Sequence, residues 1–155
     1  MHPGDEKPLQ RLNQLIGVNN NRIECLNFAA METDVSVLKV LFSRLVDTSI
    51  ICREELVKEV YKLGGIPEEG TVPYFEFFKA WVEVKSAISR NDHRAILGSC
   101  AYEEGVVLRS YETVIRQGEE ELNTQQHRLF SRQYEQLLAD HERVHNLLGV
   151  LEKAA

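Results

Sequence analysis

Residues 124–152 read TQQHRLFSRQYEQLLADHERVHNLLGVLE, and this stretch decides the class of fold. Its apolar and aromatic positions, with one histidine, step by four and then three residues in turn. They are Phe130, Tyr134, Leu137, His141, Val144, Leu148 and Leu151. Such steps place side chains along one seam of a helix, as in a coiled coil. The stretch therefore predicts a helix over 124–152 that runs nearly parallel to its neighbours.

Three further segments carry a helical period, and none shows the apolar–polar alternation of a half-buried strand. We predict helices over residues 8–32, 35–63 and 92–117. Residues that suit helix ends support these limits. They are Asp34 before the second helix, Gly64 and Gly65 after it, Asn91 or Asp92 before the third, Gly118 after it, and Asn123 or Thr124 before the last.

The segment between the second and third long helices is far longer than a turn between adjacent antiparallel helices. Its second half, 74–89, is itself amphipathic, which predicts a shorter helix. One face carries Tyr74, Phe77, Phe78, Trp81, Val84 and Ile88. This aromatic face is expected to cover the outside of the bundle; the alternative is that it binds a partner.

Two antiparallel helix pairs joined by a long crossover form the ferritin-like version of the four-helix bundle. We therefore predict an all-α protein in which residues 1–155 form a single ferritin-like domain. The crossover contains the fifth, short helix, and the second and third long helices run parallel.

The chain also resembles a known family along nearly its whole length. The resemblance rests on the run Asn19–Glu24, on 41–44 and 55–70, on Trp81 with 85–87, on 91–97, on Glu104 with Tyr111, and on 132–134 with His141. These residues are similar to a proteobacterial family of ferritin-like bundles of unknown function. The resemblance implies that fold and carries no established activity.

Composition limits the partners and the compartment. The net charge is −6 and no segment gathers Lys and Arg, so we expect neither nucleic acid nor a membrane surface as a partner. No apolar run reaches the length of a membrane span or a signal peptide, which predicts a cytoplasmic protein. The three cysteines, Cys25, Cys52 and Cys100, are widely spaced and are expected to be buried hydrophobic residues.

One motif suggests zinc chemistry. Residues 141–145, HERVH, match the H-E-x-x-H pattern, which places two imidazoles and a general-base glutamate on one helix of a zinc peptidase. A catalytic zinc also needs a third protein ligand. Among the residues after His145, only Glu152 has a side chain that could bind zinc. The alternative is that His141 belongs to the helix seam and that Glu142 and His145 are its surface neighbours.

A ferritin-like di-metal centre uses four Glu and two His from four helices. The full set is excluded because no histidine lies between His2 and His93. A reduced site remains: Glu24, Glu104 and His141 would bind one divalent metal, either iron, manganese or zinc. In the alternative, Glu104 forms a buried hydrogen bond or ion pair with His141 or with Tyr and Asn side chains, which fixes the helix register.

We therefore expect a non-enzymatic binding or stress-associated accessory protein that can form a homo-oligomer and has no certain cofactor. The first alternative is a metal-binding redox or storage protein that uses Glu24, Glu104 and His141. The second is the zinc peptidase. The sequence does not identify a protein partner or a reaction.

Overall fold

The computed structural model describes residues 2–154, which form five helices and contain no strand. Their bounds lie within two residues of the predicted ranges. The helices are α1 (Glu6–Glu32), α2 (Ser36–Lys62), α3 (Phe75–Ser89), α4 (His93–Gln117) and α5 (Thr124–Ala154). The prediction of an all-helical protein is confirmed.

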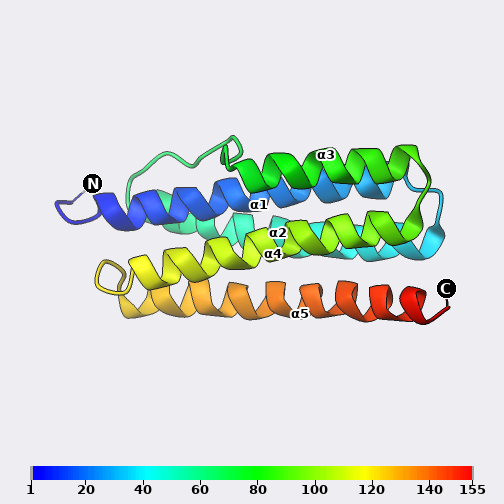
Figure 1. Ribbon diagram of the computed structural model, residues 1–155. Helices are drawn as coiled ribbons and strands as arrows, with labels where there is room; N and C mark the ends of the chain where they lie inside the picture. Colours follow the sequence, from blue (N-terminus) through cyan, green and yellow to red (C-terminus); the bar gives the residue numbers. More distant parts are fainter. Residues whose placement is uncertain (1, 155) are drawn as a thin grey trace.

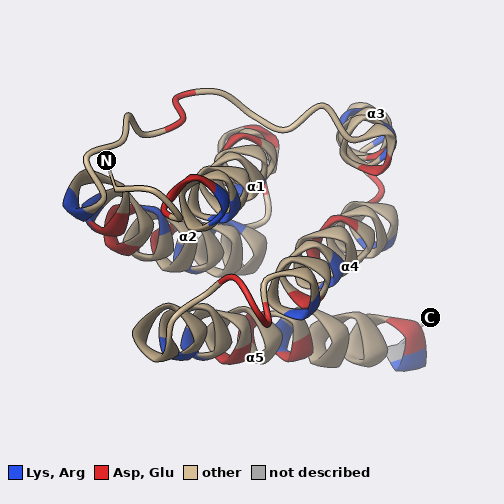
Figure 2. Cartoon of the chain, turned by 90° about the vertical axis from the view of Figure 1, so that its left-hand side faces the viewer, with Lys and Arg blue, Asp and Glu red and all other residues tan. Residues whose placement is uncertain are grey.

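The helices form a bundle of two antiparallel pairs (Figure 1). Helix α1 packs mainly against α2, and α4 packs mainly against α5. The crossover reverses the direction of the chain, so α2 and α4 run parallel, as predicted (Figure 1). Helix α3 lies outside these four helices, where it packs along α4 and also contacts α1 (Figure 2).

Helix α2 and the short α3 end in the backbone motifs that glycine and asparagine favour. Gly64, with φ 74°, follows α2, and the Gly65 amide donates to the Val60 carbonyl at 3.1 Å. This is a Schellman motif, which explains why Gly64 and Gly65 stop the helix. Asn91, with φ 52°, ends α3 in the same way, and Asp92 then caps α4 by accepting from the Ala95 amide at 3.1 Å.

Helix α5 begins with a reciprocal cap. The Gln126 amide donates to Asn123 Oδ1 at 2.8 Å, and the Asn123 amide donates to Gln126 Oε1 at 2.9 Å.

The predicted Asp34 cap of α2 is wrong. Val35 precedes the helix, and its amide instead donates to Thr33 Oγ1 at 3.3 Å.

The apolar core divides into two clusters, one toward each end of the bundle. A polar layer separates them at mid-height, where Arg22, Ser49, Glu104 and Asp140 are all buried. This layer shifts the seam predicted for α5. Gln133 and Asp140 are buried, whereas the neighbouring Tyr134 and His141 are only half-buried. Polar partners on other helices bind Gln133 and Asp140, and the apolar period alone does not reveal them.

Candidate functional site

A fully buried arginine joins four helices at the centre of the bundle. Arg22 of α1 is 0% exposed, and its guanidinium donates to Glu104 of α4 through Nε at 2.7 Å and Nη2 at 2.6 Å. Nη2 also donates to Asp140 Oδ2 of α5 at 3.1 Å. Nη1 donates to the Leu45 carbonyl and to Ser49 Oγ of α2 at 2.8 and 2.9 Å. All five guanidinium N–H groups therefore have acceptors.

The charges of this layer balance without any further group. Arg22 pairs with Glu104 and Asp140, and the second oxygen of Asp140 accepts from Arg143 Nη1 at 2.9 Å. Two cations thus face two carboxylates. Buried ion pairs persist in proteins only when each charge is matched and hydrogen bonded in this way.

The carboxyl group of Glu103, the residue before Glu104 in α4, takes no part in these ion pairs. Glu103 is 1% exposed, and neither of its carboxyl oxygens has a hydrogen-bond partner among residues 2–154. Burial raises the pKa of Glu103 well above its usual value, and the charge of Glu104 adds to the rise, while Arg22 opposes it. Both main causes favour the protonated carboxyl group.

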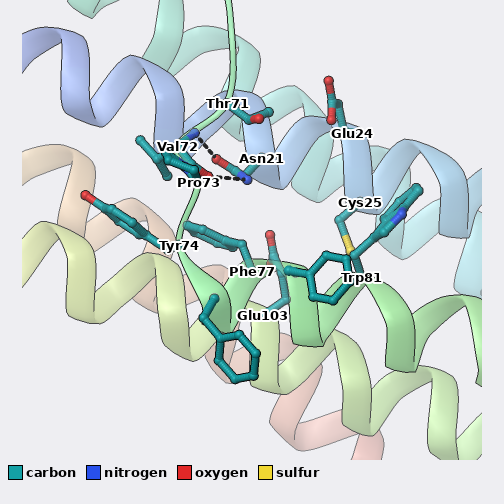
Figure 3. A pocket seen from close by; sticks show the side chains of 12 residues that line it. Asn21, Glu24, Cys25, Thr71, Val72, Pro73, Tyr74, Phe77, Trp81 and Glu103 are labelled. Carbon is teal, nitrogen blue, oxygen red and sulfur yellow. Dashed lines mark hydrogen bonds between the residues drawn. The ribbon is translucent and has the colours of Figure 1, made fainter.

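Glu103 forms the floor of a pocket of about 430 Å³. The pocket lies between α1, the end of the crossover and α3, and the Glu103 carboxyl group points into it (Figure 3). Five of the lining residues are aromatic. Its lining is Asn21, Glu24, Cys25, Thr71, Val72, Pro73, Tyr74, Phe75, Phe77, Phe78, Trp81 and Glu103.

Asparagines of α1 hold the crossover that closes one side of the pocket. Asn21 accepts from the Val72 amide at 2.8 Å and donates to the Val72 carbonyl at 3.3 Å (Figure 3). One turn away, Gly17 leaves room for this segment, because a Cβ there would lie 2.8 Å from Val72 Cγ1. Asn20 also donates to the Gly70 carbonyl at 2.9 Å, so these two asparagines pin an irregular segment that has no helix of its own.

Aromatic contacts hold the other side. Phe28 of α1 meets Trp81 of α3 edge to face, with ring centroids 5.0 Å apart, and Tyr74 stacks on Phe77 at 6.0 Å. The predicted aromatic face of α3 therefore does cover the bundle. Phe78 does not follow this pattern, because the residue is 64% exposed at the pocket. Phe75, at the start of α3, also lines the pocket and is 71% exposed.

The three predicted metal ligands are not gathered. Glu24 is exposed at the rim of the pocket, and its carboxylate points away from Glu103 (Figure 3). The predicted ion pair of Glu104 exists, but its partner is Arg22, in place of His141. No three His, Cys, Asp or Glu side chains within residues 2–154 form a group that would hold a metal ion. Metal binding by Glu24, Glu104 and His141 stays a prediction.

The H-E-x-x-H string has its two imidazoles in contact. The rings of His141 and His145 meet edge to face with centroids 4.5 Å apart, while Glu142 is exposed. His141 Nδ1 is buried and has no hydrogen-bond partner in the described chain. Burial, followed by the His145 charge, lowers the pKa of His141. No third ligand completes a zinc site here within the described residues.

The cysteines are buried and free, as predicted. Burial raises the pKa of Cys52 to about 12, and it raises the pKa of Cys25 and Cys100 well above the ordinary value. Because the thiolate is the reactive form, Cys25 is a poor nucleophile although it lines the pocket.

The layer and the pocket contain groups that sequence reasoning missed. Arg22, Asp140 and Glu103 were not among the predicted site residues. A signal for Arg22 does exist: the buried positions of α1 step through Leu15, Asn19, Arg22 and Leu26, so a charged residue stands in the apolar period. Glu103 carries no such signal, because its burial depends on α3.

Comparison with family models places the chain. The model described as "Domain of unknown function (DUF2383)" matches residues 7–117, more than half of the 155 residues. The chain belongs to this family. The DUF2383 match confirms the predicted membership in a family of unknown function. It contains Arg22, Glu104 and every residue of the pocket lining, whereas Asp140 and His141 lie beyond it.

The comparison with curated proteins finds no match. Within residues 2–154, no helix of this DUF2383 protein is long and apolar enough to span a membrane.

Proposed function

We propose that this protein is a non-enzymatic accessory binding protein, built as a ferritin-like bundle, whose aromatic pocket binds one small organic molecule. The parallel run of α2 and α4 across a long crossover supports the ferritin-like placement. The observation that carries the proposed function is the buried carboxyl group of Glu103, which has no hydrogen-bond partner among residues 2–154 and points into an aromatic pocket.

The size and lining of the pocket suit a ligand. Small-molecule sites are typically concave, mostly apolar and roughly 300–1,000 Å³ in volume, with a few polar groups that orient the ligand. The 430 Å³ pocket has this balance, because five rings surround Glu103 and Asn21. Burying a carboxyl group without a partner costs free energy, and a bound ligand with a hydrogen-bonding group would offset that cost.

The centre of the bundle supports binding over metal chemistry. Ferritin-like proteins place their metals between the four helices. In this chain the Arg22 guanidinium occupies that position, and its contacts use the carboxylates of Glu104 and Asp140. The aromatic pocket lies to one side of this layer, between α1 and α3.

A neutral aromatic probe tests the proposal. Trp81 is the single tryptophan of the chain and lines the pocket, so its fluorescence should change saturably as 2-phenylethanol is added. Phe78→Ala removes a ring at the pocket and should weaken binding roughly threefold to tenfold. Val40→Ala is the control, because Val40 is 71% exposed on α2 and does not line the pocket.

The measurement has a clear contrary result. If neither fluorescence nor calorimetry detects saturable binding of aromatic probes, the pocket is not a ligand site. Equal weakening in Phe78→Ala and Val40→Ala would likewise place the binding elsewhere.

A further inference from the structure

The chemistry of the lining restricts the class of ligand. Two acidic residues, Glu24 and Glu103, line the pocket, and no Lys, Arg or His of the described chain does so. Two lysines of α3 instead lie over rings: Lys79 Nζ is 5.4 Å from the Tyr102 centroid, and Lys85 Nζ is 5.5 Å from that of Trp81. The pocket is therefore acidic and aromatic, with no internal cation.

The charge balance beside the pocket leads to the same class. Arg22 and Arg143 are matched by Glu104 and Asp140, so within the described part of the chain Glu103 is the one buried carboxyl group of the cluster without a basic partner. A buried carboxyl group in this position either keeps a proton or takes a cation from outside. The pocket gives an external cation room to reach it.

The aromatic rings complete the recognition. An ammonium group is attracted to the face of Trp, Tyr or Phe, and this attraction strengthens where water is excluded. Phe77, Phe78 and Trp81 come from α3 and line the pocket together with Glu103 from α4. A ligand with a charged amine and an apolar body would satisfy both the carboxylate and the rings.

We propose that the ligand of this pocket is a small organic amine, bound as its cation, with its ammonium group at Glu103 and its apolar body among Phe77, Phe78 and Trp81. This inference rests on the proposed binding function and names its ligand class. Where the free protein carries Glu103 as the carboxylic acid, amine binding leaves a carboxylate, and the released proton passes to the solvent while the ammonium keeps its own. Charge is thus conserved: one cation enters and one proton leaves.

The groups around Glu103 determine how binding depends on pH. Arg22 and Cys25 face it from α1, and Cys100 and Glu104 face it from α4. The side chains that α3 contributes to the lining are aromatic. Where Glu103 is protonated in the free protein, the affinity for an amine should rise by up to about tenfold per pH unit, because fewer protons compete. It should level off once Glu103 is ionised.

Two isosteric probes separate the ligand class from binding itself. 2-Phenylethylamine is a cation at neutral pH, and 2-phenylethanol has the same shape without the charge. The amine should bind roughly tenfold or more tightly to the wild-type protein. Glu103→Gln should abolish that preference while keeping 2-phenylethanol binding, and Glu24→Gln, at the rim, should reduce the preference only slightly.

Proton release supplies a readout that needs no variant. Calorimetry of the amine in two buffers of different ionisation enthalpy should show the release of up to one proton per ligand bound, and 2-phenylethanol should show none. If Glu103→Gln does not fold, this measurement still decides the inference.

The outcomes are distinguishable. If the alcohol binds and the amine binds no better, or binds without proton release below the pH at which its affinity levels off, the ligand class is wrong and the binding function stands. If neither probe binds, the binding function itself fails. If a second copy of the chain covers the pocket, light scattering will show a dimer that both probes fail to enter, which overturns both proposals.

Discussion

Glu103 and Glu104 are consecutive residues of α4, both buried, yet only Glu104 has a cationic partner. Glu104 accepts two hydrogen bonds from Arg22, whereas the oxygens of Glu103 have no partner among residues 2–154. Neighbouring residues of a helix point about 100° apart. Glu104 therefore faces the bundle centre, and Glu103 faces the pocket under α3. This division separates what stabilises the fold from what is free to bind a ligand.

Removing the charge of Glu104 should destabilise the protein strongly. Glu104→Gln leaves Arg22 buried with Asp140 as its remaining carboxylate, and breaking such a pair costs about 3–5 kcal/mol. Urea unfolding measures this loss. The control Glu142→Gln, at an exposed position of α5, should change the free energy of unfolding by less than about 0.5 kcal/mol.

A combined replacement tests the reason for that loss. Changing Arg22, Glu104 and Asp140 together to Met removes the buried charges, and much of the stability should return. A triple variant that is less stable than Glu104→Gln would contradict the account of Arg22 as an orphaned charge.

Glu103→Met should stabilise the protein, and the gain should grow with pH. The pKa of Glu103 is raised in the folded state above its ordinary value of 4.5. The folded protein therefore binds the proton more tightly than the unfolded chain, so the wild-type protein loses stability as pH rises above about 4.5. Urea unfolding at pH 4.5, 6 and 8 should show a gain of about 1–3 kcal/mol at the highest pH.

The pH dependence is the decisive part of this experiment. Glu103→Gln cannot ionise either, so its stability relative to wild type should grow with pH in the same way as that of Glu103→Met. A stability difference that is constant from pH 4.5 to 8 would mean that Glu103 does not titrate as its burial predicts.

Loss of the Asn21 amide should loosen the crossover. Asn21→Ala removes both hydrogen bonds to Val72, at an expected cost of about 1–2 kcal/mol. Limited proteolysis should then cut residues 63–74 faster than in the wild-type protein. Asn27→Ala is the matched control, because Asn27 is an exposed asparagine of the same helix; equal cleavage in both variants would show that Asn21 does not hold this segment.

Chelation should leave the fold unchanged. Protein purified without a histidine tag should melt in the same cooperative transition before and after treatment with EDTA, because Arg22 already pairs with Glu104 and Asp140. Elemental analysis provides the opposing test. Stoichiometric iron, manganese or zinc that disappears in both Glu104→Ala and His141→Ala would establish the predicted metal site.

Much of the fold was predictable because its signals are local. Helix periods, the glycines after α2 and the caps at Asp92 and Asn123 depend on residues only a few positions apart. Asp34 shows the limit of this approach. It has the right residue type for a cap, but the Thr33 hydroxyl binds the Val35 amide and the helix begins one residue later.

The candidate site was much less predictable. The sequence correctly predicts a buried Glu104, but it points to His, Tyr or Asn side chains as the partner. The sequence does not single out Arg22 as this partner, because arginine is seldom fully buried. The buried face of α5 differs from the predicted seam because of two such long-range contacts. Arg22 donates to Asp140 and Tyr111 donates to Gln133, so these two residues are buried while His141 is only half-buried.

By itself, the sequence determined an all-helical chain of four long helices with a long crossover and a short aromatic helix, because periodicity and capping act over one or two turns. Which of the two neighbouring glutamates pairs with Arg22 depends on the tertiary structure alone. Arg22 and Glu104 are 82 residues apart and meet only when α1 packs against α4. The same packing, with α3 laid across it, buries Glu103 at the floor of a pocket, where it has no hydrogen-bond partner in the described chain.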